Sequence, residues 1–166
     1  MSRPLAMSAL GALMIAALIA GVMLFSASPA ANAQTVTVHK TPWCGCCAAW
    51  VDHLHDEGFY VIVKEEEDLT PIRSRLGVRD ELMSCHTAEV DGYVVEGHVP
   101  AREIRRLLEE KPDVNGVSVP GMPQGSPGME TPNAPDRYDV IIFSGEDART
   151  YASYRGTQLV SEQARP

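Results

Sequence analysis

Three cysteines, Cys44, Cys46 and Cys47, stand within four positions of the stretch TPWCGCC, and a fourth, Cys85, follows in SCHTAEV. The outer pair, Cys44 and Cys47, has the two-residue spacing of thiol–disulfide redox sites. The set Cys-x-Cys-Cys is also a group of soft ligands of the kind that selects Cu(I). These residues therefore predict either disulfide exchange or the binding of a soft metal.

The spacing of the cysteines bears on how many metal ions they can hold. Adjacent side chains of a helix point about 100° apart, so Cys46 and Cys47 are poorly placed to hold one ion together. They can each hold a different ion, with thiolate sulfurs bridging neighbours. This geometry favours a polynuclear site over a single tetrahedral zinc ion, whose ligands usually come as spaced pairs. A zinc or structural site remains a simpler interpretation of the same residues.

The redox interpretation needs Cys44 as an exposed nucleophile and Cys47 one turn later to resolve the mixed disulfide. Cys46 would stand between them as a competing thiol. No proline directly precedes Cys85, where dithiol folds commonly receive substrate peptides. Two purely structural disulfides are disfavoured because Cys46 and Cys47 are adjacent.

A hairpin brings further candidate ligands to the cysteines. The dipeptide Asp91-Gly92 predicts a two-residue turn. In the register of that turn, Cys85 faces His98, and opposed side chains share one face of a sheet. His86 is then expected on the opposite, more apolar face, near enough to support a ligand but not to bind.

Two methionines, Met122 and Met129, lie in the loop VPGMPQGSPGM, which has no helical or strand period and so no evident core face for them. Thioethers suit copper, and both are candidate ligands. Of the remaining histidines, His39 is expected to support the ligands, and His53 and His55 are weaker candidates.

The elements that must position these residues begin with a β-α-β unit. Strands are predicted over 35–40 and 59–65, the second buried on both faces, with a helix over about 44–57 between them. Positions 47, 50, 51 and 54 of that helix should face the sheet. The cysteines then lie at a helix N-terminus, where the helix dipole stabilises thiolates.

The rest of the chain completes an α/β, thioredoxin-like sandwich: a mixed sheet flanked by helices, with an added C-terminal β-hairpin. A short helix starts at Thr70 and ends at Gly77, and another runs from Pro100 to before Pro112. Residues 115–135 read as a loop, and strands at 137–143 and 150–154 form the late hairpin.

The N-terminus has the features of an export signal: an early Arg3, an apolar run over 9–25, and a cleavage pattern ending at Ala33. The predicted organisation is a signal peptide over 1–33, a metal-binding domain over 34–156 and a polar, frayed tail over 157–166. The whole chain has 14 basic and 22 acidic residues, which argues against nucleic-acid binding. We expect a periplasmic protein with no membrane attachment after cleavage.

The stretches KTPWCGCC, SCHTAEVDGYVVEGHVPA and VPGMPQGSPGME resemble the bacterial periplasmic copper-resistance proteins of the CopG type, over residues 36–143. The resemblance implies a thioredoxin-like fold that binds a cluster of copper ions through four cysteines. The resemblance also implies, less directly, that His98 and the two loop methionines are ligands. One departure is Arg79, where the family commonly has proline. The implied ligands are Cys44, Cys46, Cys47, Cys85, His98, Met122 and Met129.

Together these observations predict an exported copper-binding protein of copper resistance or homeostasis, holding more than one ion as a cysteine-bridged Cu(I) cluster. Its expected partners are copper ions and other periplasmic copper-handling proteins. The alternative is a periplasmic thiol–disulfide oxidoreductase that uses Cys44 and Cys47. Enzymatic activity stays undecided, with a binding protein favoured over a copper or thiol–disulfide oxidoreductase.

Overall fold

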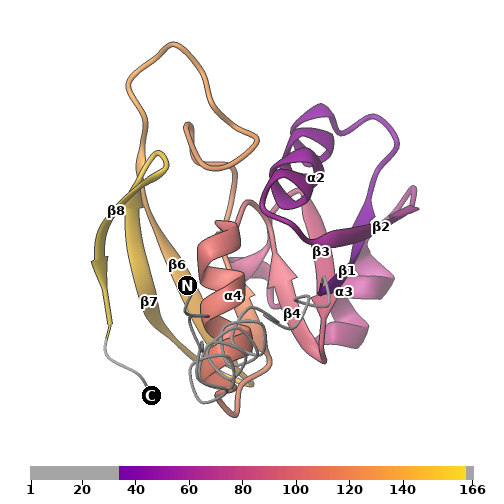
Figure 1. The fold of residues 1–166 in the computed structure, drawn as a ribbon. Helices are drawn as coiled ribbons and strands as arrows, with labels where there is room; N and C mark the ends of the chain where they lie inside the picture. Colours follow the sequence, from indigo (N-terminus) through magenta and orange to yellow (C-terminus); the bar gives the residue numbers. More distant parts are fainter. Residues whose placement is uncertain (1–33, 164–166) are drawn as a thin grey trace, which may run out of the picture. The chain divides into compact units, whose positions relative to one another are not determined.

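Eight strands form one mixed sheet, in the order β2-β1-β3-β4-β5-β6-β7-β8, in the computed structural model of the protein, which describes residues 34–163 (Figure 1). The predicted signal peptide, 1–33, lies outside the described residues. The strands are β1 (Thr35–Lys40), β2 (Tyr60–Glu65), β3 (His86–Val90), β4 (Tyr93–Glu96), β5 (Gly116–Ser118), β6 (Arg137–Ser144), β7 (Asp147–Arg155) and β8 (Gln158–Glu162). The helices are α2 (Gly45–Asp56), α3 (Thr70–Leu76) and α4 (Ala101–Glu110), with a 3₁₀ turn, η1 (Asp80–Leu82).

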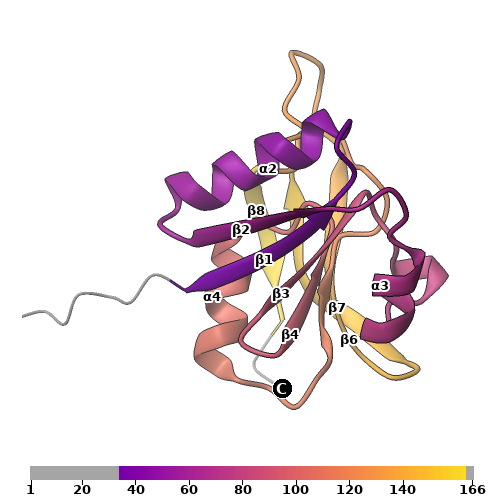
Figure 2. The same ribbon diagram turned by 90° about the vertical axis from the view of Figure 1, so that its right-hand side faces the viewer.

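The chain opens with the predicted β-α-β unit. β1 and β2 pair in parallel, with α2 as the connection between them. The predicted inner face of α2 is buried, and its apolar residues belong to one core cluster with residues of β1 and β3. α2 and α4 cover one face of the sheet and α3 lies on the other, which gives the layered arrangement expected of an α/β fold (Figure 2). Among the described residues, no helix is long and apolar enough to cross a membrane.

The β3–β4 hairpin has the register that its turn predicts. Val90 pairs with Tyr93 and Ala88 with Val95. Asp91 and Gly92 both have positive φ, at 47° and 85°, as a tight turn of this type requires. The predicted helix ends are also confirmed: Gly77 caps α3 in the left-handed conformation, and α4 ends before Pro112.

Three expectations about strands need correction. β2 is not buried on both faces, because it is the edge strand of the sheet: Tyr60, Ile62 and Val63 are 58%, 42% and 44% exposed. Its apolar composition had suggested a central strand. β5 lies inside the predicted loop 115–135, where it is too short to show a strand period.

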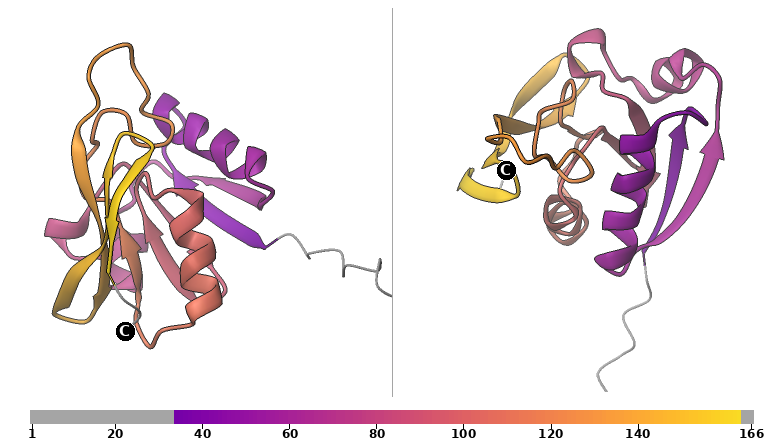
Figure 3. Two further views of the ribbon diagram at one scale, coloured as in Figure 1. Left: turned by 60° about the vertical axis from the view of Figure 1, so that its left-hand side comes forward. Right: turned by 90° about the horizontal axis from the view of Figure 1, so that it is seen from above.

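The third correction concerns the C-terminus. The predicted late hairpin is β6 and β7, but the segment expected to be a frayed tail continues into β8, which pairs with β7. These three strands curl around α4 (Figure 3). Tyr151 and Tyr154 of β7 donate hydrogen bonds to Glu110 and Glu103 of α4, at 2.8 and 2.6 Å. The added strands are therefore held to the core by buried polar contacts as well as by apolar packing.

Candidate metal centre

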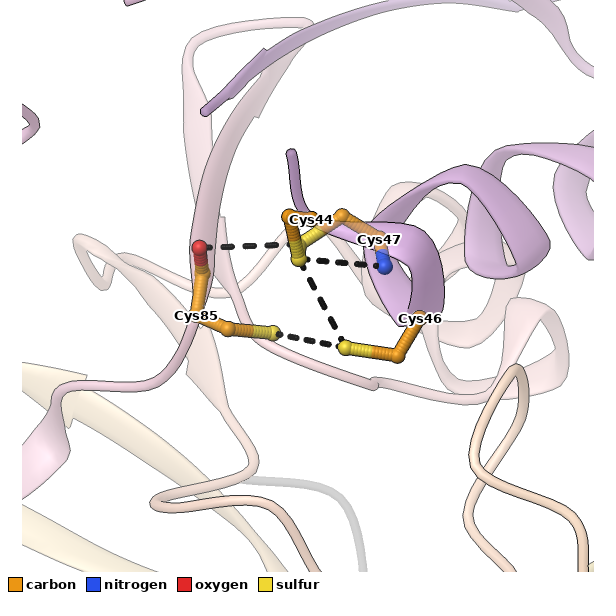
Figure 4. A group of neighbouring side chains, drawn as sticks. All are labelled: Cys44, Cys46, Cys47 and Cys85. Atoms are coloured by element: carbon orange, nitrogen blue, oxygen red, sulfur yellow. Dashed lines mark hydrogen bonds between the residues drawn. A yellow bond between two sulfur atoms is a disulfide. The ribbon is translucent and has the colours of Figure 1, made fainter. Parts of the chain in front are cut away.

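Four cysteine sulfurs converge where the start of α2 meets the residue before β3 (Figure 4). Cys44 is the N-cap residue of α2, and its sulfur accepts a hydrogen bond from the backbone N–H of Cys47 at 3.3 Å. Cys47 is fully buried, and Cys46 and Cys85 are half-buried. All four sulfurs lie within 4.8 Å of one another. Two segments that are distant in the sequence therefore form one thiol cluster.

Cys44 and Cys47 are joined by a disulfide in this structure, and Cys46 and Cys85 are free. The sulfur of Cys46 lies 3.5 Å from that of Cys44 and 3.9 Å from that of Cys85. Cys46 is thus between the disulfide and the cysteine of the hairpin. This is the position that a bridging thiolate would need, and also that of a thiol competing for the disulfide.

A buried ion pair holds the backbone around Cys85. Glu96 is fully buried, and its carboxylate accepts hydrogen bonds from the Arg73 guanidinium at 3.0 Å and from the Ser84 backbone N–H at 2.7 Å. Arg73 also donates to the Ser84 carbonyl, and the Thr87 hydroxyl donates to the other oxygen of Glu96. Contacts at Ser84 and Thr87 therefore fix the chain on both sides of Cys85. No motif in the sequence predicts this pair, although the register set by Asp91-Gly92 places Glu96 opposite Thr87.

His98 reaches Cys85, which confirms the predicted contact, although the strand pairing expected to make it ends at Thr87 and Glu96. Its Nε2 lies 3.0 Å from the Cys85 sulfur, and its Nδ1 lies 2.7 Å from the carbonyl oxygen of Pro127. A carbonyl only accepts, so Nδ1 carries the proton and Nε2 presents its lone pair to the sulfur. This tautomer is the one required of a metal-binding imidazole.

The prediction that His86 points away from this group was wrong. Its Nδ1 lies 3.4 Å from the Cys85 sulfur, and its ring centroid is 5.0 Å from that of His98. β4 ends at Glu96, and Gly97 follows with φ of 73°, so the alternation of faces stops before His98. The turn at Gly97 brings His98 to the side of the sheet that His86 faces.

Burial shifts the pKa values of these side chains in the metal-free protein. Burial, with the charge interaction of neighbouring Cys46 as the second cause, raises the pKa of Cys85 to about 12. Burial lowers the pKa of His98, and burial together with His98 lowers that of His86 well below its usual value. At neutral pH both imidazoles are therefore neutral and can act as ligands, whereas Cys85 must release a proton to bind a metal.

The loop after β5 lies against the start of α2. A Cβ on Gly128 would approach the backbone nitrogen of Trp50 to 2.6 Å and the carbonyl oxygen of Cys46 to 2.9 Å. Met129, next in the chain, is half-buried. Met122 is 58% exposed and lines a surface hollow beside β6, with Tyr138 among the other lining residues. As ligands, both methionines stay predictions.

Of the remaining histidines, His55 is exposed and the other two have partners outside the thiol cluster. His39 faces carboxylates, with Nδ1 3.2 Å from Glu66 and Nε2 3.4 Å from Glu89, instead of supporting the cysteines as expected. His53 accepts a hydrogen bond from the first N–H of α4, that of Ala101, at 3.1 Å. It therefore satisfies a helix N-terminus that has no side-chain cap of its own.

Substituting Gly97 should disturb both the fold and the site. Gly97→Ala places a Cβ at positive φ, 2.6 Å from the carbonyl oxygen of Val119 and against Ser84. The backbone conformation alone costs about 1–3 kcal/mol. We expect the unfolding free energy in urea to fall by more than for Gly92→Ala, whose φ is similar but whose Cβ would meet open space. Equal losses in the two variants would contradict this close packing.

Comparison with known proteins places the chain in a family. Two solved structures, described as Copper resistance protein copG, Form 1 and Form 2, are each 44% identical to the chain with a TM-score of 0.71. The alignments cover 75% and 74% of this chain, and 100% and 99% of those chains. The chain belongs to the CopG family. No curated protein matches it.

A second comparison agrees with the CopG relationship. The family described as Protein of unknown function, DUF411, matches residues 82–129. This span contains Cys85, both histidines of the site and the two loop methionines, but not the cysteines of α2. The CopG structures extend the similarity over most of the described chain, as the three sequence stretches predicted.

Proposed function

We propose that this protein binds copper in copper resistance or homeostasis and holds several Cu(I) ions in a cysteine-bridged cluster. The observation that carries the proposal is the convergence of four sulfurs from two distant segments within 4.8 Å. A purely structural pair of disulfides would leave no free thiols, whereas Cys46 and Cys85 are free. Membership of the CopG family supports copper as the metal.

The donor set fits Cu(I). Thiolates and thioethers are soft ligands that select this ion, and imidazole is acceptable to it. Cys46 lies within 4 Å of the sulfurs on either side, so one thiolate there can bridge neighbouring ions. The Cys44–Cys47 disulfide must be reduced before those two sulfurs can act as thiolates. We propose Cys44, Cys46, Cys47, Cys85 and His98 as ligands, with Met122 and Met129 as additional soft donors.

Two features extend the proposal. The strand order β2-β1-β3-β4, with α2 after β1 and α4 after β4, supports a thioredoxin-like classification of this half of the fold. The signal-like N-terminus supports export to the periplasm, where other copper-handling proteins would exchange copper with this one. An enzymatic form of the proposal is cycling of the bound ions between Cu(I) and Cu(II), which needs an electron acceptor to oxidise Cu(I) and a reductant to restore it; turnover assays that supply both would test it.

A second candidate function is thiol–disulfide exchange. The Cys44–Cys47 disulfide at the start of α2 favours it, because the N-cap position stabilises the thiolate of Cys44 when the bond is reduced. Cys46, 3.5 Å from Cys44, weakens it, since a third thiol at that distance can itself attack the disulfide.

Titration of the reduced protein with Cu(I) tests the copper proposal. We expect more than one ion per chain, measured by metal analysis after removal of loosely bound copper. The emission of Trp50 should fall as the site fills, because its ring centroid lies 4.3 Å from that of His86. A Trp43→Phe variant isolates this signal, since Trp43 is the other tryptophan. Saturation at one ion or fewer would reject the cluster.

A further inference from the structure

Cys85 belongs to a second donor set besides the thiol cluster. Its sulfur, an imidazole nitrogen of His86 and one of His98 all lie within 4.8 Å of one another. The sulfur–nitrogen separations are 3.4 Å to His86 Nδ1 and 3.0 Å to His98 Nε2. Two imidazoles and one thiolate at such separations can hold a single ion between them.

The two imidazoles are held in place before any metal binds. His98 is anchored through Nδ1 to the Pro127 carbonyl, so its other nitrogen is directed at Cys85. His86 is fully buried, and its ring packs against the indole of Trp50 at a tilt of 39°. The Nε2 of His86 is buried without a hydrogen-bond partner in the described part of the chain. The assignment of His86 as a ligand rests on its Nδ1, which lies 3.4 Å from the Cys85 sulfur.

This donor set does not depend on the cysteines that form the disulfide. Cys44 and Cys47 cannot both serve as thiolate ligands while they are joined, but Cys85 is free and keeps both histidine contacts. The free sulfur of Cys46 lies 3.9 Å away and can approach as a fourth ligand. The hydrogen bond from the Ser84 backbone N–H to Glu96, next to Cys85 in the chain, involves neither cysteine of the disulfide.

We propose that Cys85, His86 and His98 form a mononuclear metal site that stays functional in the disulfide form of the protein. One thiolate and two imidazoles suit a borderline ion, such as copper or zinc, better than an all-thiolate cluster does. The protein then holds one ion when Cys44 and Cys47 are oxidised and several when they are reduced. The identification of the physiological ion as copper rests on the function proposed above. The existence of the donor set does not depend on that function.

Cobalt(II) added to the disulfide form tests the site, because tetrahedral cobalt absorbs in the visible range and thiolate ligands add a charge-transfer band. A thiol assay should first count two free thiols per chain. We expect one cobalt ion per chain with both spectral features. The Cys44→Ser/Cys47→Ser double variant, which keeps only Cys46 and Cys85, should bind the same single ion.

Histidine variants assign the ligands. His86→Asn and His98→Asn should each weaken cobalt binding by at least about tenfold. His55→Asn, which changes an exposed histidine of α2, should bind like the unmodified protein. X-ray absorption of the zinc-loaded, unmodified protein in its disulfide form should detect two imidazoles and at least one sulfur. This measurement tests the site even if His86→Asn does not fold.

The inference is overturned if the disulfide form binds no cobalt, if both histidine variants bind normally, or if the zinc spectrum lacks two imidazoles. These results are separable from the Cu(I) titration of the reduced protein. Several Cu(I) ions with no cobalt site would leave the proposed function standing and remove this inference. One cobalt ion without multiple Cu(I) binding would do the opposite.

Discussion

Cys46→Ser is expected to lower the number of Cu(I) ions that the reduced protein binds, to at most one in each of the two donor groups that remain, Cys44 with Cys47 and Cys85 with the two histidines. The Cys46 sulfur is the one that lies within 4 Å of both Cys44 and Cys85, so its loss divides the thiol cluster into two parts. A serine hydroxyl is a hard, weak ligand that cannot bridge Cu(I) ions. Metal analysis of the reduced, copper-saturated variant measures the effect.

The same variant separates the two candidate functions. Cys44 and Cys47 remain one helical turn apart, so a thiol–disulfide oxidoreductase should keep its disulfide reductase activity or gain from the loss of a competing thiol. Cys44→Ser is the matched control, because it removes the disulfide and should abolish any such activity. Full copper binding by Cys46→Ser, together with reductase activity that depends on Cys44, would favour the oxidoreductase.

Arg73→Met is expected to lower the free energy of unfolding by about 3–5 kcal/mol, the usual cost of leaving a buried charge without its partner. Glu96 is fully buried, and Arg73 is its ion-pair partner at 3.0 Å. Methionine keeps much of the arginine's length without its charge. Chemical denaturation of the metal-free protein gives the free energy directly.

The pH dependence of this variant has a definite sign. Burial already raises the pKa of Glu96, and loss of the favourable Arg73 charge raises it further. The native state then holds a proton that the unfolded chain releases near pH 4.5. The variant should therefore lose stability as pH rises from that value through the folded pKa of Glu96.

A matched control lies on the same helix. Arg75→Met removes an ion pair with Glu89 in which the side chains are 55% and 36% exposed, so the expected loss is about 1 kcal/mol or less. The rate at which a thiol reagent labels Cys85 is a second readout. Ser84, next to Cys85, loses its contact with Arg73 in Arg73→Met and keeps it in Arg75→Met, so the labelling rate should change only in Arg73→Met. Equal stability losses in the two variants would show that the buried pair has no special role.

Local patterns in the sequence were sufficient for the first half of the fold. Helical spacing identified the buried face of α2, and Asp91-Gly92 set the register of the β3–β4 hairpin. These features depend on residues close in the chain, where periodicity and turn geometry act directly. β5 and β8 were missed because their pairing partners, and not their own residues, decide that they are strands.

The residues of the site also fall into two groups: those that the sequence predicted and those that only the tertiary structure brings together. The sequence by itself determined that soft sulfur donors are concentrated in this chain, that three of them start a helix, and that His98 comes close to Cys85. Only the tertiary structure decided that His86 joins this group, because the turn at Gly97 ends the strand alternation that the prediction assumed. It also decided that Arg73 and Glu96 hold Cys85, since a buried ion pair between separate elements depends on how those elements pack together.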